Sequence, residues 1–261
     1  MTSNAFEIKI HGPVGTIIFN RPDQQNALTQ AMLEGLTQAL DDFYLEKRVR
    51  AIVLTGKGNS FCAGMDAREI SNRFQLPNAT ELWAESASAY RELILRMLEV
   101  TKPIIASVNG PAVAGGAGLV LASDIVIADP NASFGLPDPQ RGLVAGIVTP
   151  LAAFRLGAGT AARLALTGSL FPANEARQMG VYHELVDHDQ LWARATEIGT
   201  ACAAGAPEAI QLTKRLISET VGEQHAAQLS AGAAASATAL TTDSAREGIA
   251  AFLEKRPPEW K

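Results

Sequence analysis

Cysteine and histidine are scarce in this sequence, and its basic residues form no cluster. The only cysteines, Cys62 and Cys202, are too few for a disulfide framework and lack metal-ligand spacing, so we expect a reducing, cytoplasmic compartment and no bound metal. With a net charge of −5 and no Lys/Arg block, the chain is not expected to bind nucleic acid. No segment has the roughly 18 apolar residues of a membrane helix, so we expect no membrane partner.

The chain alternates predicted strands and helices in its first half. Its 261 residues are 47% hydrophobic, which suits one large folded unit. Alternating residues around Pro13 and Gly15 predict a β-hairpin over 6–20, and helical spacing of apolar residues after Thr29 predicts the first helix. Buried strands, separated by helices, are predicted at 51–55, 104–108 and 124–128. This pattern indicates an α/β fold.

Helical patterns dominate after Gly142. They predict helices at 147–156, 160–167, 187–203, 207–220 and 225–253. The strand signals fade there, apart from a short strand predicted at 183–186. Because no linker rich in proline, serine and charge separates the halves, we expect a core over 1–200 and a C-terminal helical region over 201–261 that belong to one functional unit.

Two glycine-rich turns each follow a predicted strand and precede a predicted helix. One contains Phe61 to Asp66, and the other runs from Asn109 to Gly118. Free N–H groups at the start of a helix point toward a ligand, and two that converge can hold an oxygen that becomes negative in a transition state. Ordinary strand-to-helix connections have the same appearance, so spacing alone leaves both interpretations open. Cys62, which has no cation or histidine beside it, is predicted to be a small buried residue rather than a nucleophile.

Several longer motifs resemble those of the crotonase, or enoyl-CoA hydratase/isomerase, superfamily. They are Arg21-Pro22 with Asn26-Ala27-Leu28, LTGKGNSFCAGMD at 54–66, KPIIASVNG at 102–110 and FGLP at 134–137. The resemblance runs from about Phe6 to the C-terminus. It implies a spiral of ββα units followed by a helical trimerisation region, and a homotrimer or a dimer of trimers.

The resemblance also implies an acyl-CoA thioester substrate, with coenzyme A as part of the substrate and no other cofactor. By position, the backbone N–H groups of Met65 and Gly115 correspond to the family's oxyanion hole. The family's segment around coenzyme A corresponds to the five residues Ala27, Ala63, Asp66, Ala67 and Arg68. Within it, Arg68 is a candidate partner for phosphate, with a solvated helix face as the alternative, and Asp66 also suits a helix start.

The acids differ from those of the family's hydratases, which have glutamates at the positions of Gly118 and Asp138. Water addition to a C=C bond is readily shared by two carboxylates, whereas one base is enough to move a proton between two carbons. We therefore expect Asp138 to be the general acid/base, with a turn residue between Pro137 and Pro139 as the alternative, and isomerisation to be slightly favoured over hydration. Thioester or C–C hydrolysis, and a catalytically weak acyl-CoA-binding protein, remain as alternatives.

Overall fold

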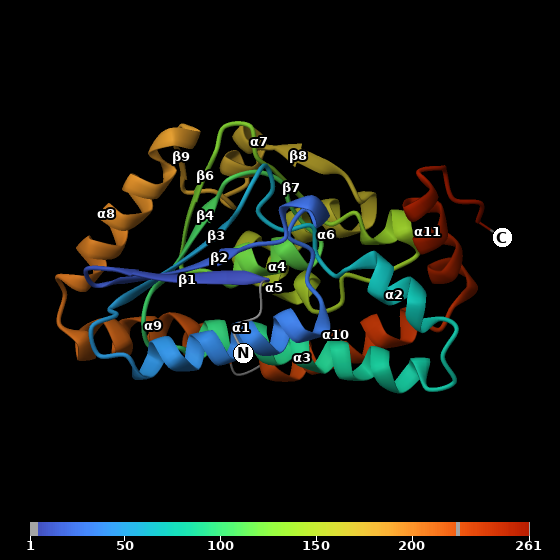
Figure 1. Cartoon of the computed structure of the whole chain (residues 1–261), viewed down its shortest axis with the longest axis horizontal. Coiled ribbons are helices and arrows are strands. Elements are labelled where there is room, and N and C mark those ends of the chain that lie inside the picture. The colour runs from blue at the N-terminus through green and yellow to red at the C-terminus, as the bar shows by residue number, and fades with distance from the viewer. Residues whose placement is uncertain (1–4, 223–224, 261) are drawn as a thin grey trace.

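A six-stranded sheet runs through the centre of this computed structural model, which describes residues 5–222 and 225–260 (Figure 1). The strand order is β1-β2-β3-β4-β6-β9. The strands are β1 (Phe6–His11), β2 (Val14–Phe19), β3 (Ala51–Gly56), β4 (Ile104–Val108), β6 (Ile125–Ala128) and β9 (Glu184–Leu185). The predicted hairpin is confirmed, because β1 and β2 pair antiparallel from Phe6↔Phe19 to His11↔Val14, whereas the other pairs are parallel.

A second sheet has the order β5-β7-β8 and consists of short strands. They are β5 (Ala112–Val113), β7 (Ser133–Gly135) and β8 (Leu170–Pro172). Successive passes of the chain place one strand in each sheet: β4 is followed by β5, and β6 is followed by β7. The pass that contains β3 reaches the second sheet through an isolated bridge between Cys62 and Ala112. The expected spiral of ββα units is thus present.

Both faces of the central sheet are covered by helices, which is why its strands appear in the sequence as continuous apolar runs. Ile52 and Leu54 face the main core with α1 (Gln30–Leu45) and α3 (Ala79–Glu99). The alternate residues, Ala51 and Val53, pack with α8 (Leu191–Ala203) on the opposite side (Figure 1). Thr29 caps α1, as predicted, because its side chain accepts a hydrogen bond from the N–H of Met32.

The other helices surround the second sheet or lie toward the C-terminus. The α-helices are α2 (Ala67–Arg73), α4 (Gly115–Ala122), α5 (Val148–Leu156), α6 (Ala158–Thr167), α7 (Ala173–Gln178), α9 (Pro207–Gly222), α10 (His225–Ala239) and α11 (Asp243–Glu254). The 3₁₀ helices are η1 (Pro22–Gln24), η2 (Asp138–Arg141) and η3 (His188–Gln190). Among residues 5–222 and 225–260, no helix has the length and apolar character needed to cross a membrane.

The prediction of one helix over 225–253 is wrong. The structure has α10 and α11, separated by a turn in which Thr242 caps α11 by accepting from the N–H of Ala245 at 3.1 Å. The threonine side chain competes with helix propagation and starts a new helix. The turn lets α10 pack against α3 and α5, while α11 packs against α2 and η2.

Helix α9 is attached to the body of the molecule by a buried lysine. The ammonium of Lys214 donates to the carbonyls of Met97 and Lys102, at 3.1 and 3.2 Å, and to Asp124 Oδ2 at 2.7 Å. Asp124 Oδ2 also accepts from the N–H of Ile104 at 2.8 Å. Asp124 therefore has a structural role: it joins α9 to the start of β4.

Candidate active site

The two glycine-rich turns meet at the entrance to α4. At Gly64, φ is +85°, and a Cβ there would lie 2.8 Å from both Ala114 Cβ and the nitrogen of Gly115. Ala114 has φ 51° and ψ −124°, a conformation that residues other than glycine rarely adopt and that costs about 1–3 kcal/mol. Glycine at 64 and the strained alanine at 114 bring the two loops into direct contact.

Two backbone N–H groups at this junction are without acceptors in the described part of the chain. Leu28 and Met65 form a parallel bridge in which Leu28 bonds to Gly64 O and to the N–H of Asp66, so the N–H of Met65 faces away from Leu28. Gly115 is the first residue of α4, and the first N–H groups of a helix have no intrahelical acceptor. Met65 and Gly115 both line one cavity. These are the two residues predicted to donate to an oxyanion.

That cavity leaves about 110 Å³ for the centres of water-sized molecules. Most of its lining is apolar and comes from α2, α3, α5, α11 and the loop after η2. Apolar residues in the lining include Leu28, Ile70, Trp83, Leu143, Ile147, Val148 and Ile249. A concave, mostly apolar lining with a few polar groups suits a small-molecule site. The predicted residues Met65, Asp66, Ala67, Gly115 and Asp138 all lie in its wall.

Asp138 brings a carboxylate to this apolar wall from the start of η2. Within the described residues its Oδ2 has no hydrogen-bond partner, and almost none of that atom's surface is accessible. Burial raises the pKa of Asp138 to about 6, although the nearby guanidinium of Arg141 opposes the shift. A carboxylate with a pKa near neutrality can both take up and release a proton.

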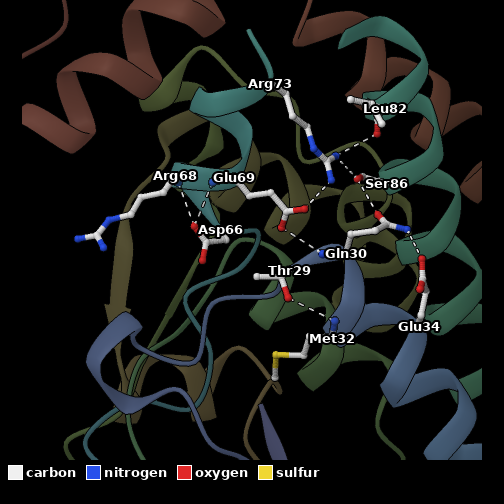
Figure 2. Close-up of polar contacts among 10 residues, drawn as sticks. All are labelled: Thr29, Gln30, Met32, Glu34, Asp66, Arg68, Glu69, Arg73, Leu82 and Ser86. Atoms are coloured by element: carbon white, nitrogen blue, oxygen red, sulfur yellow. Dashed lines mark hydrogen bonds and ion pairs between the residues drawn. The ribbon is translucent and has the colours of Figure 1, made fainter. Parts of the chain in front are cut away.

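A polar groove adjoins the cavity, and Asp66 and Glu69 line both. The groove also contains Arg21 and Arg68. Arg68 is exposed, and Figure 2 shows its side chain pointing away from Glu69. The structure does not place Ala27 or Ala63 in the lining described for either space. Their backbones bond to neighbouring residues: Ala27 O accepts from Arg21 Nη1, and the N–H of Ala63 donates to Gln25 O at 3.0 Å.

Asp66 holds the start of α2 in place. Its Oδ1 accepts from the N–H groups of Arg68 and Glu69, at 3.0 and 3.3 Å, and its Oδ2 is 2.8 Å from Arg21 Nη2. Burial alone would raise the pKa of Asp66, but the arginine and the two N–H groups lower it below its ordinary value. The suggested helix-start role of Asp66 therefore fits its contacts.

A polar network links the helices around the mouth of the cavity (Figure 2). Arg73 of α2 donates to Glu69 Oε1 and to Ser86 Oγ of α3, both at 2.5 Å. Ser86 Oγ in turn donates to Gln30 Oε1 at 2.8 Å, and the N–H of Gln30 donates to Glu69 Oε2 at 3.1 Å. The network closes a ring through α1, α2 and α3, so the charges of Arg73 and Glu69 are already matched within the protein.

Tyr90 is the residue at this site that the sequence analysis missed. It lies in α3, lines the cavity, and its hydroxyl donates to Gly115 O at 2.6 Å. A Cβ on Gly118 would lie 2.0 Å from that hydroxyl. The helical spacing of apolar residues marks this part of α3 as buried, but nothing in the sequence indicates which turn of α4 it contacts. Cys62 is buried, as predicted, and burial raises its pKa to about 12.

Comparison with known proteins gives the family that the sequence motifs resemble, and the match extends over nearly the whole chain. The sequence profile of the enoyl-CoA hydratase/isomerase family matches residues 9–261. A putative enoyl-CoA hydratase of Thermus thermophilus is 37% identical over 95% of this chain and 98% of its own. A mevalonyl-coenzyme A hydratase of Aspergillus fumigatus is 34% identical over 94% of this chain and 90% of its own.

Solved structures agree with this family. An enoyl-CoA hydratase/isomerase from Xanthobacter autotrophicus has a TM-score of 0.89 at 28% identity, covering 98% of each chain. An enoyl-CoA hydratase from Mycobacterium avium has a TM-score of 0.87 at 32% identity and covers 100% of each chain. The fold is that of the crotonase superfamily, and within it this chain belongs to the enoyl-CoA hydratase/isomerase family.

Proposed function

We propose that this protein acts on the C=C bond of an enoyl-CoA thioester, through an enolate, in fatty-acid or related acyl-CoA metabolism. The observation that carries the proposal is the joint placement of three groups on one apolar cavity: the free N–H groups of Met65 and Gly115, and the buried carboxylate of Asp138. Two convergent N–H donors suit an oxygen that gains charge, and a carboxylate with a raised pKa suits proton transfer at carbon.

Isomerisation is the reaction that this set of groups supports best. The thioester oxygen would accept from the two N–H groups while Asp138 removes a proton from the α-carbon of a 3-enoyl thioester. The C–H electron pair then forms a double bond between the carbonyl carbon and the α-carbon, and the former C=O pair moves onto the thioester oxygen, which gives a dienolate that still holds the β,γ double bond. Protonated Asp138 returns the proton to the γ-carbon, which leaves a 2-enoyl thioester and an ionised carboxylate.

Coenzyme A would enter this scheme only as part of the substrate. The polar groove with Arg21 and Arg68 adjoins the apolar cavity, which matches a ligand with a polar nucleotide end and an apolar acyl end. Arg68 is the groove's exposed cation and is proposed to face the phosphates. The scheme uses no metal and no further cofactor.

The deciding assay compares purified protein with 3-enoyl-CoA and 2-enoyl-CoA substrates of several chain lengths. We expect double-bond migration to exceed water addition, and Asp138→Ala to abolish turnover while acyl-CoA binding persists. Unchanged kinetics in Asp138→Ala would remove Asp138 from the mechanism. Acyl-CoA binding without turnover in the wild type would favour the catalytically weak binding protein, and release of free coenzyme A would favour thioester hydrolysis.

Association of the chain into a trimer, or a dimer of trimers, is proposed on separate grounds. Helix α9 exposes Leu212, Leu216 and Ile217, each more than half accessible. Contiguous exposed apolar side chains mark an interaction surface. Light scattering after size-exclusion chromatography should give a mass of three or six chains, and a monomeric mass at micromolar concentration would contradict the proposal.

A further inference from the structure

Tyr90 fills the space in which a side chain at position 118 would lie. The two residues lie on different helices, α3 and α4, yet a Cβ on Gly118 would be 2.0 Å from Tyr90 Oη and 3.2 Å from Tyr90 Cζ. Val148 Cγ2, at 3.0 Å, closes the other side. Glycine is therefore required at 118 as long as Tyr90 is present, and a tyrosine hydroxyl stands where a side chain at 118 would begin.

The hydroxyl of Tyr90 has a definite hydrogen-bond partner. It donates its only proton to Gly115 O at 2.6 Å, a short and strong geometry for an O–H donor. Tyr90 is 5% exposed, and burial keeps the pKa of its hydroxyl well above its ordinary value. The phenol therefore stays neutral and keeps this bond, so it is not a proton donor to substrate.

The accepting carbonyl belongs to the residue whose N–H faces the cavity. Gly115 begins α4 directly after Ala114, whose φ of 51° is unfavourable for an alanine. Glycine at 115 adds no side chain to restrain this turn. Apart from the bonds of α4 itself, the Tyr90 hydroxyl makes the one side-chain hydrogen bond that Gly115 has within the described residues.

We propose that Tyr90 is a positioning residue: by holding the Gly115 carbonyl, it fixes the first turn of α4 so that the Gly115 N–H points at the thioester oxygen. The inference rests on the proposed function, because it assigns Tyr90 a part in the same oxyanion site. Misplacement of a catalytic group by a fraction of an ångström lowers the rate strongly while ground-state binding changes little.

Tyr90→Phe tests the inference, because it keeps the ring and removes only the hydroxyl. Tyr44→Phe is the matched control, since Tyr44 is 44% exposed on α1 and lies outside the site. The infrared band of the thioester carbonyl in bound hexanoyl-CoA, which has no C=C bond to react, reports how strongly the two N–H groups polarise it. Turnover of 3-enoyl-CoA and the melting temperature are measured in parallel.

In Tyr90→Phe we expect kcat to fall about tenfold, KM to change less than about twofold, and the carbonyl band to move back toward its position in water. Tyr44→Phe should match the wild type. If Tyr90→Phe keeps both the wild-type carbonyl band and the wild-type kcat, the inference is overturned. A tenfold fall in kcat while the band stays at its wild-type position would overturn it as well. If hexanoyl-CoA fails to bind the wild type, or binds without a band shift, the proposed function itself fails.

Discussion

Asp138 carries the raised pKa that a proton-transferring carboxylate at neutral pH requires. Its Oδ2 lacks a partner among the described residues, and burial raises its pKa to about 6. Only the ionised form can remove a proton from carbon. We therefore expect kcat/KM to rise with pH through about 6 and then level off, as measured with 3-enoyl-CoA between pH 4.5 and 8.5. A profile without an inflection between about pH 5 and 7 would contradict the assignment.

The same burial should make Asp138 costly for folding. Its pKa is about 6 in the folded protein against an ordinary value of 3.8, so the folded state binds the proton more tightly than the unfolded state. Stability is then lost as pH rises from about 4 to 6, and the full loss persists above 6. Asp138→Asn should raise the free energy of unfolding by on the order of 2 kcal/mol at pH 7.5. The gain should vanish near pH 4, and urea unfolding at both pH values measures it.

Residues that interact with their own neighbours in the chain were the ones open to prediction. The start of α1 at Thr29 and of α2 at Asp66 each depend on a side chain that bonds to N–H groups two or three residues ahead. The role of Tyr90 depends on Gly115, in another helix and 25 residues away. No local pattern indicates that pairing, because the packing of α3 on α4 creates it.

At the level of elements, α3 and α4 limit which acids the site can hold. A glutamate at 118 would meet the Tyr90 hydroxyl, so Gly118→Glu alone should misfold or lose activity. In Tyr90→Ala/Gly118→Glu the tyrosine side chain is gone, Val148 Cγ2 at 3.0 Å is the remaining close neighbour, and the second carboxylate can occupy the space of the Tyr90 ring, which lines the cavity. We expect the double variant to add water to 2-enoyl-CoA faster, relative to double-bond migration, than Tyr90→Ala does. An equal ratio in the two variants would show that a second acid at 118 does not promote hydration.

Short strands and helix breaks were the elements that sequence patterns missed. Strands β5, β7 and β8 have two or three residues each, too few for an alternating pattern to be recognised. Their order follows from the spiral, in which β5 pairs with β7 and β7 pairs with β8. The end of α10 was missed because alanine-rich sequence continues the helical pattern up to the cap at Thr242.

For the whole molecule, Lys214 and Asp124 form a buried ion pair between the C-terminal helices and the α/β core. The lysine side chain is 7% exposed, and it bonds to Asp124 and to the carbonyls of Met97 and Lys102. Removing one partner of a buried pair leaves the other charge uncompensated. Lys214→Met should lower the free energy of unfolding by about 3 kcal/mol, whereas Lys47→Met, at an exposed position, should change it little. Equal effects of the two variants in denaturant unfolding would contradict this role.

The overall architecture was more predictable than the site because it rests on long apolar runs. The core strands of the central sheet and most helices have periodic signals, and the motif loops lie at fixed points between them. The arrangement of the cavity depends on elements from distant parts of the sequence, as the contributions of Tyr90, Val148 and Ile249 show. Sequence motifs therefore identified the loops that bear the N–H donors, but not the walls that face them.

The depth at which Cys62 lies makes the protein suitable for labelling with a single reporter. Cys62 is fully buried and its pKa is about 12, whereas Cys202 on α8 is partly accessible. A maleimide dye should attach once per native chain, at Cys202, and a second time only after denaturation, which mass spectrometry can count. Because α8 packs on the sheet face opposite α1 and α3, such a dye would follow assembly or unfolding without entering the cavity.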